Sequence, residues 1–239
     1  MFYPLDLFYL HCPKLVSYPS KNFVYMPIKL GIVPVTPYEQ NCSILVCQET
    51  GDAAIVDPGG DVDKILEGVK QMGGTVKKIL LTHGHLDHCA AAKDLADTLS
   101  VPIEGPQIDE RFWIDQLPEQ TVRFGFGHAK VFEPTRWLED GDHVQVGNID
   151  LEVLHCPGHT PGHVVFFDKE DRLALVGDVL FAGSIGRTDF PRGNHADLIN
   201  AIRTKLWPLG DDVQFVPGHG PMSTFGKERQ TNPYVGDGA

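Results

Sequence analysis

Short apolar runs separated by turn residues fill the first half of the chain. The runs at 29–35, 42–47, 53–57 and 76–81 are rich in Ile, Val and Leu and have strand length, so they predict β-strands. Residues 61–72 place apolar side chains near helical spacing and are followed by two glycines, which predicts a helix that ends there. A second helix is predicted at 89–100. Strands alternating with helices indicate helices packed on the faces of a sheet.

The second half shows the same kind of pattern. Strands are predicted at 143–146, 149–156, 163–167, 173–178 and 212–219, and an amphipathic helix at 195–209. Residues 105–128 are predicted to be helix and loop, and to form part of a lid or pocket wall. Because composition changes little along the chain, residues 26–239 are expected to fold as one domain. Residues 1–25 are aromatic but have no clear period, and are interpreted as an N-terminal extension that need not be ordered for folding or activity.

Composition and charge narrow the classes of partner. The 239 residues carry a formal net charge of -12, and an acidic chain repels phosphate backbones, which argues against a nucleic-acid partner. No apolar run approaches the ~20 residues needed to span a bilayer, so no membrane partner is expected. The chain has five cysteines, an odd number, and no CxxC pair. A disulfide framework is therefore not expected, which favours a reducing, cytoplasmic setting. Nothing in the sequence indicates the oligomeric state.

The polar residues that follow the predicted strands suggest chemistry. The stretch HGHLDH places three histidines and an aspartate within residues 83–88, and GHTPGH, GD and PGHG follow later strands. Imidazole and carboxylate are ligands of zinc and similar divalent metals. Each group alone is commonly a surface residue or a turn former, but four groups in this order favour a metal site. The candidate ligands therefore lie within residues 83–88 and at His159, Asp178 and His219.

The order HxHxDH, GHTPGH, GD and PGHG resembles the metallo-β-lactamase superfamily and, within it, the hydroxyacylglutathione hydrolases (glyoxalase II). The resemblance covers the chain from about Met26 nearly to its end. It implies an α/β (α+β) fold, an αββα sandwich of two mixed β-sheets with helices on the outer faces, and metals at one edge between the sheets.

The same resemblance implies a division of the ligands. One metal ion would be held by His83, His85 and His159, and a second by Asp87, His88 and His219, with Asp178 bridging the two. His163 matches none of these ligand positions and is interpreted as a polar strand residue. Asp57, in VDPGG, is expected to accept a hydrogen bond from a ligand imidazole. A turn or a helix cap accounts for Asp57 equally well.

The activity implied by the resemblance is hydrolysis of a small-molecule thioester, S-D-lactoylglutathione, to D-lactate and glutathione. A hydroxide between two divalent ions would attack the thioester, and Asp87 and Asp178 would be the catalytic carboxylates. Zinc is expected, and iron or manganese is compatible with the same ligands. By the same resemblance, the chain is expected to be a short form without the family's C-terminal helical domain. Arg187 is a candidate carboxylate anchor, with an ion pair to Asp189 as the alternative, and Phe181 a candidate pocket residue.

Other functions remain open at this stage. A persulfide dioxygenase with one iron ion would use His83, His159 and Asp178. A β-lactamase is disfavoured because those zinc enzymes generally lack the bridging aspartate, and a nuclease is disfavoured by the acidic charge. A purely metal-binding module would close the metals off completely, whereas seven ligands for two ions leave room for water.

Overall fold

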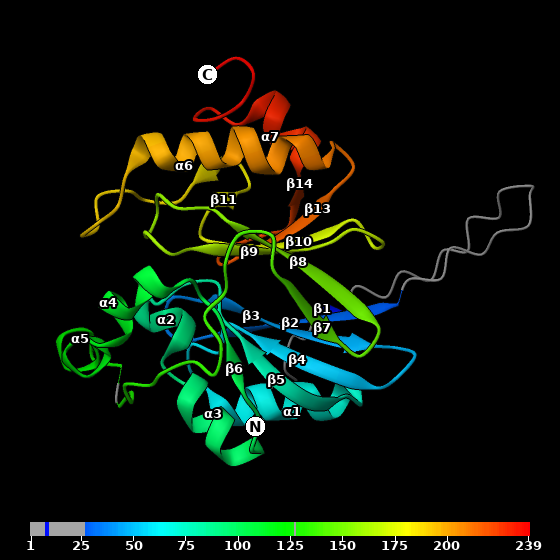
Figure 1. Ribbon diagram of the computed structural model, residues 1–239, viewed down its shortest axis with the longest axis vertical. Helices are drawn as coiled ribbons and strands as arrows, with labels where there is room; N and C mark the ends of the chain where they lie inside the picture. The colour runs from blue at the N-terminus through cyan, green and yellow to red at the C-terminus, as the bar shows by residue number, and fades with distance from the viewer. Residues whose placement is uncertain (1–7, 10–26, 127) are drawn as a thin grey trace, which may run out of the picture.

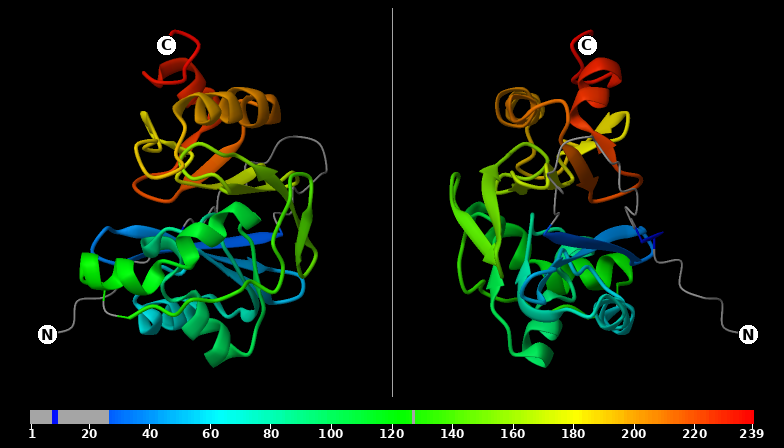
Figure 2. Two further views of the ribbon diagram at one scale, coloured as in Figure 1. Left: turned by 60° about the vertical axis from the view of Figure 1, so that its left-hand side comes forward. Right: turned by 90° about the vertical axis from the view of Figure 1, so that its right-hand side faces the viewer.

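The computed structural model describes residues 8–9, 27–126 and 128–239, and its core is two six-stranded sheets lying face to face. Helices cover the outer face of each sheet, so the layers follow one another as helix, sheet, sheet, helix (Figure 1). Two further views show the same order of layers (Figure 2). The αββα sandwich predicted from the sequence is therefore confirmed.

The first sheet has the strand order β1-β2-β3-β4-β5-β6. Its last three strands are parallel and the others antiparallel, which makes it a mixed sheet. Parallel neighbours need a crossover, and α1 and α3 cross the outer face to provide one. The strands are β1 (Phe8–Tyr9), β2 (Ile28–Val35), β3 (Gln40–Cys47), β4 (Asp52–Val56), β5 (Thr75–Leu80) and β6 (Ile103–Glu104), and the helices are α1 (Val62–Met72), α2 (Leu86–Cys89) and α3 (Ala92–Leu99).

The second sheet has the order β14-β13-β10-β9-β8-β7, with β10 and β13 parallel. The crossover between these two is α6 (His195–Ala201), which continues as a π-helical turn (Ile202–Leu206) and a 3₁₀ turn (Trp207–Leu209). The strands are β7 (His143–Val146), β8 (Ile149–His155), β9 (Val164–Asp168), β10 (Leu173–Gly177), β13 (Gln214–Pro217) and β14 (Ser223–Thr224), followed by α7 (Phe225–Thr231). A small separate ribbon joins β11 (Leu180–Phe181) to β12 (Ser184–Ile185).

Three apolar clusters hold the layers together. Leu45, Phe166 and Val216 belong to the cluster between the two sheets. A second cluster lies under α1 and α3, and a third under α6 and α7. The second half of β3 (ILVC) and most of β9 (VVFF) are buried and are continuous apolar runs in the sequence.

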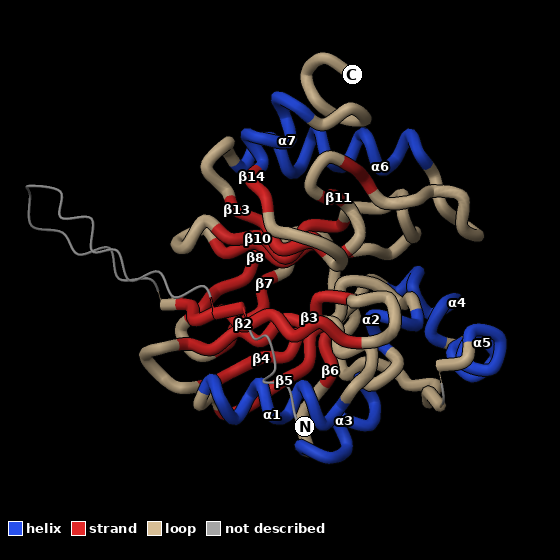
Figure 3. Tube along the Cα trace, turned by 180° about the vertical axis from the view of Figure 1, so that it is seen from behind, coloured by secondary structure: helices blue, strands red, loops and turns tan. Residues whose placement is uncertain are grey.

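Most predicted elements are present within a few residues of their expected ends. The helix predicted at 89–100 is wrong in its extent, because the structure has α2 and α3 with a break between them. The segment 105–128 contains a 3₁₀ turn (Ile108–Glu110), α4 (Arg111–Ile114) and α5 (Leu117–Phe124). Viewed from behind, α4 and α5 lie at one side of the sandwich and not on a sheet face (Figure 3).

The predicted extension is only partly covered by the structure. Within it, Phe8–Tyr9 pair with β2 and form the edge strand β1. The other residues of 1–25 lie outside the described residues, so the domain boundary near Met26 stays a prediction. Among the described residues, no helix is long and apolar enough to cross a bilayer.

Candidate metal centre

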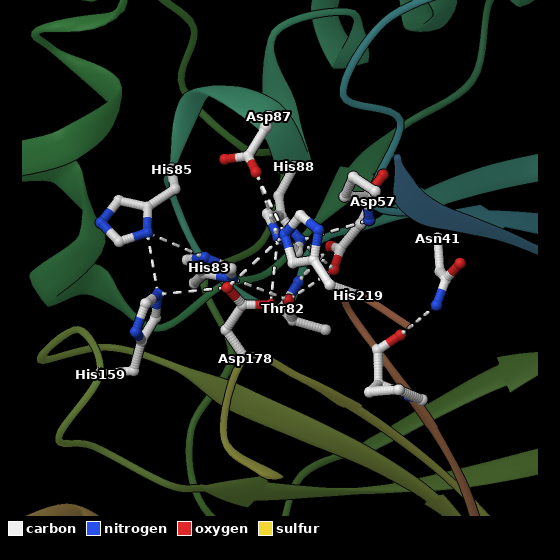
Figure 4. A network of polar contacts seen from close by, with 12 residues as sticks. Asn41, Asp57, Thr82, His83, His85, Asp87, His88, His159, Asp178 and His219 are labelled. Carbon is white, nitrogen blue, oxygen red and sulfur yellow. Dashed lines mark hydrogen bonds and ion pairs between the residues drawn. The ribbon is translucent and has the colours of Figure 1, made fainter. Parts of the chain in front are cut away.

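The seven candidate ligands follow the carboxyl ends of four strands. His83 to His88 come after β5 and run into α2, His159 comes after β8, Asp178 directly follows β10 and His219 follows β13. In the second sheet β8, β10 and β13 point the same way, since β9 is antiparallel to both of its neighbours. Their carboxyl ends therefore meet at one edge of the sandwich, facing the loop after β5 (Figure 4).

Three imidazole nitrogens converge on one point of this edge. His85 Nδ1 lies 3.1 Å from His83 Nε2 and 2.9 Å from His159 Nε2. Nitrogens bound to one zinc ion at about 2.1 Å in a tetrahedron would be a little over 3 Å apart. The three side chains are therefore close to the spacing that a single divalent ion requires.

A second group forms beside the first. Asp87, His88 and His219 bring one ligand atom each within 4.8 Å of one another, with 3.2 Å between His219 Nε2 and Asp87 Oδ2. Asp178 lies between the groups, since its Oδ1 is 3.3 Å from His88 Nε2 and its Oδ2 is 3.5 Å from His159 Nε2. The two oxygens of one carboxylate thus face both groups.

The outer nitrogens of these histidines are fixed by hydrogen bonds. His159 Nδ1 donates to the Arg187 carbonyl and His219 Nδ1 to the Tyr38 carbonyl. His88 Nδ1 donates to Asp57 Oδ2 at 3.0 Å. Donation from Nδ1 leaves the lone pair on Nε2, which in each ring is the nitrogen that faces the centre.

Asp57 accepts hydrogen bonds from Thr82 as well as from His88. Its carboxylate accepts from the backbone N–H of Thr82 at 2.7 Å and from the Thr82 hydroxyl at 2.6 Å. That hydroxyl in turn lies 3.1 Å from His83 Nδ1 and is placed to accept from it. Asp57 therefore orients His88 directly and His83 through Thr82.

The charges of the buried groups match this arrangement. Burial, with repulsion from the neighbouring His88, holds the pKa of His83 well below its usual range, so the ring is a neutral ligand at physiological pH. Burial opposes charge on His88, but the carboxylates of Asp178 and Asp87 outweigh it and raise the pKa well above the ordinary value. Positive charge is therefore stabilised where His88 faces Asp178.

The residues fit a bound cation on chemical grounds. His88 Nε2 and Asp178 Oδ1 are both buried without a hydrogen-bond partner among the described residues, and they face each other. When His88 is neutral and donates from Nδ1 to Asp57, its Nε2 lone pair faces Asp178 Oδ1, and two facing acceptor atoms call for a cation between them. The backbone also comes close, since a Cβ on Gly218 would lie 2.1 Å from Asp178 Oδ1, so only glycine fits there.

Two buried residues that support the site were missed in the sequence. His163 is buried completely, stacks on His83 and accepts a hydrogen bond from the Asp178 backbone N–H at 3.0 Å. It directly precedes β9 and is not part of the strand as predicted. Glu110 is also buried completely and accepts from the N–H groups of Gly84 and Gly162, both at 2.7 Å. One carboxylate thus ties the loop of His83 and His85 to the loop of His159.

The two candidate substrate contacts lie near different histidines of the centre. Phe181 is near the second group, with its ring centroid 6.3 Å from that of His219. Arg187 forms a bidentate pair with Asp189, with N···O distances of 2.9 and 2.8 Å, which is the alternative considered from the sequence. Its guanidinium also lies over the Phe190 ring, which contacts His85 and His159.

Two facing mixed sheets with paired His and Asp groups at one edge define a class of metal-dependent hydrolases. A model of the metallo-beta-lactamase superfamily matches residues 35–219, and this chain belongs to that superfamily. It is a metal-dependent hydrolase, and divalent metals fit its His and Asp groups.

Individual relatives resemble nearly the whole domain. The chain is 44% identical over 209 residues to hydroxyacylglutathione hydrolase GloC of Haemophilus influenzae, covering 87% of this chain and 98% of that protein. The crystal structure of BLEG-1 B3 metallo-beta-lactamase has a TM-score of 0.79 at 33% identity, covering 86% of this chain and 99% of that one. The structure of TTHA1623 in a di-iron-bound form has a TM-score of 0.77 at 33% identity, covering 85% and 99%.

Proposed function

We propose that this protein hydrolyses S-D-lactoylglutathione to D-lactate and glutathione, using two divalent metal ions. The convergence of seven metal-binding side chains at one edge of the sandwich is the observation that carries the hydrolytic part of the proposal. The similarity to a hydroxyacylglutathione hydrolase over most of both chains supports the substrate.

In this proposal His83, His85 and His159 would hold the first ion and Asp87, His88 and His219 the second, with Asp178 shared. The distances within each group and the position of Asp178 between them support this division. Zinc suits the mixed nitrogen and oxygen donors, and iron and manganese suit them as well. A related structure was obtained in a di-iron-bound form, so elemental analysis is needed to assign the metal.

Bound divalent ions supply a Lewis acid for the thioester carbonyl and lower the pKa of a water toward neutrality. The protein's own side chains then position the reactants. Asp87 is partly exposed at the centre, and its Oδ2 faces His219. From there it can accept a hydrogen bond from the attacking water and fix its direction. His163 holds the backbone at Asp178, which limits the movement of the shared carboxylate.

The substrate enters this proposal as a small molecule. Phe181 is proposed to line the pocket on the side of His219. Arg187 is proposed to contact the glutathione part, although its pair with Asp189 has to open or to share its donors for this contact. A cytoplasmic location is proposed as well, supported by the free thiols of Cys42, Cys47, Cys89 and Cys156.

A glutathione-persulfide dioxygenase with one iron ion is the second candidate. His83, His159 and Asp178 are close together and would suffice for a single iron site, since His159 Nε2 is 3.5 Å from Asp178 Oδ2. The 44% identity to a hydroxyacylglutathione hydrolase over most of both chains favours the hydrolase.

The test combines metal analysis with two assays on the same preparation. We expect two metal ions per chain, release of glutathione from S-D-lactoylglutathione, and no oxygen uptake with glutathione persulfide. One iron ion per chain with oxygen uptake and no thioester hydrolysis would replace the proposal with the dioxygenase.

A further inference from the structure

A wall of aromatic rings leads away from the first group of histidines. The rings of Trp113 and Phe190 each contact His85, with centroids 4.5 and 4.8 Å from it. Phe112 continues this wall, with its ring centroid 5.3 Å from that of Trp113. These rings come from α4 and from the loop between β12 and α6, and the Trp113 and Phe190 rings bring the two segments together, with centroids 6.3 Å apart.

Two arginines flank the wall, and they differ in their partners. Arg187 lies over the Phe190 ring but gives its donors to Asp189. Arg192 is exposed, with its Cζ 4.1 Å from the Phe112 ring centroid. Within the described part of the chain, no carboxylate forms an ion pair or hydrogen bond with Arg192. Its guanidinium is therefore held by a ring face while its N–H edges remain available.

The loop that carries Arg192 is fixed beside the metal centre. At one end the Arg187 carbonyl accepts from His159 Nδ1, and at the other the Asn194 N–H donates to the Gly158 carbonyl at 2.8 Å. Arg192 itself has a φ of 66°, a left-handed conformation that costs a residue other than glycine about 1 kcal/mol. An arginine is thus kept at a backbone position that suits glycine, with its side chain packed on the aromatic wall.

We propose that Arg192, on its Phe112 platform, is a subsite for a carboxylate of the thiol half of the substrate. The planar fork of arginine matches a carboxylate in a bidentate contact. In a chain with a net charge of -12, an unpaired guanidinium next to the centre is a local attraction for an anionic group.

The proposed ligand class is a peptide thiol that carries free carboxylates, so this inference rests on the proposed thioester hydrolysis. The thioester is carried by the cysteine of the peptide, so a carboxylate on the next residue lies about 7 Å from it along the chain. Arg192 follows Phe190 by two residues, and the Phe190 ring contacts that of His85 with centroids 4.8 Å apart. A carboxylate of the peptide can therefore meet Arg192 while the thioester lies at the metal centre.

The experiment measures steady-state kinetics of the metal-loaded enzyme with three thioesters of lactate. These are S-lactoylglutathione, the neutral S-lactoyl-N-acetylcysteamine, and lactoyl-CoA, whose anionic groups are phosphates. The variants are Arg192→Ala, Arg192→Gly and Arg187→Ala, with Arg203→Ala as the matched control. Arg203 is an exposed arginine in the π-helical turn that follows α6, outside the loop of Arg192.

We expect both Arg192 variants to raise KM for the glutathione thioester about tenfold, as for an exposed charge-assisted hydrogen bond, with kcat nearly unchanged. Kinetics with the neutral thioester should not change, and the inhibition constant of free glutathione should rise in parallel. Because glycine relieves the left-handed backbone, Arg192→Gly should fold at least as well as the wild type. Arg187→Ala should have a smaller effect, and Arg203→Ala none.

Several outcomes would overturn the subsite. An unchanged KM for the glutathione thioester, an equal rise for the neutral thioester, or an effect confined to lactoyl-CoA would each contradict a carboxylate contact at Arg192. A full effect in Arg187→Ala with none in Arg192→Ala would move the contact to Arg187. If the wild type hydrolysed none of the three thioesters, the proposed function would fail, and the subsite would fail with it.

Discussion

At the scale of single residues, the side chains around the candidate ligands are as ordered as the ligands themselves. Asp57 has a φ of 52°, a left-handed conformation that Asp and Asn tolerate better than most residues. From that position it reaches both Thr82 and His88. The proposed centre therefore depends on a carboxylate outside the seven candidate ligands.

Asp57→Asn tests this dependence. Asparagine keeps the backbone conformation but has only one acceptor oxygen, so it cannot serve the Thr82 N–H, the Thr82 hydroxyl and His88 Nδ1 as the carboxylate does. We predict metal binding weakened 10- to 100-fold, as is common when such an outer partner is lost. Competition titration with a chromophoric chelator measures this, with Asp52→Asn, a surface residue paired with Lys77, as control. Equal affinities in all three proteins would show that Asp57 serves only the turn.

Glu110 gives a pH-dependent prediction. Burial raises the pKa of its carboxyl to about 7, although hydrogen bonds from the protein act in the opposite direction. In the unfolded chain the pKa of this carboxyl is about 4.3. Between these two values the folded protein keeps a proton that the unfolded chain releases, so the free energy of unfolding falls as the pH rises from about 4.5 to 7.

Glu110→Gln removes this titration. We predict that the wild type loses up to about 3 kcal/mol more of its free energy of unfolding between pH 4.5 and 7.5 than Glu110→Gln does. Urea unfolding at several pH values gives the comparison. The same pH dependence in both proteins would mean that the carboxyl titrates near its ordinary value.

At the scale of elements, the start of α6 is linked to the metal centre. The Asn194 side chain accepts from the N–H groups of Ala196 and Asp197 and so caps the helix, while its own N–H donates to Gly158, next to His159. Asn194→Ala should cost about 1 kcal/mol of stability, whereas Asn194→Asp keeps the cap and should cost much less. Chemical denaturation measures the free energy of unfolding of the two variants. An equal loss of this free energy in both would show that the cap contributes nothing.

The elements also show what the sequence could and could not predict. The seven candidate ligands were visible because each follows a strand of clear apolar pattern within a few residues. The strands β6, β11, β12 and β14 have two residues each, too few to show a period, and α7 has only seven. Glu110 gave no signal because it bonds backbone N–H groups 26 and 52 residues away, and such bonds leave no trace in the partner's residue type.

At the scale of the whole molecule, the two sheets contribute different parts of the centre. The loop after the first sheet's β5 supplies His83 to His88, and the second sheet supplies His159, Asp178 and His219. Metal ions that join these parts are expected to stabilise the folded protein, because the unfolded chain does not hold them together.

Metal removal tests this connection between the sheets. Saturating metal at about a thousand times its Kd adds about 4 kcal/mol to stability, which for a domain of this size raises Tm by roughly 10 °C. We predict a fall of this order when the protein is treated with a chelator and its recovery when zinc is added back. An unchanged Tm after complete metal removal, checked by elemental analysis, would contradict a stabilising role.

The most direct test of the central claim compares the wild type with Asp178→Asn for metal content and hydrolysis of S-D-lactoylglutathione in the same experiment, with the exposed Asp150→Asn as control. The account predicts two metal ions and thioester hydrolysis in the wild type and the control. In Asp178→Asn it predicts reduced content of both ions and a loss of at least about a hundredfold in kcat/KM. Full metal content and normal turnover in Asp178→Asn would contradict it.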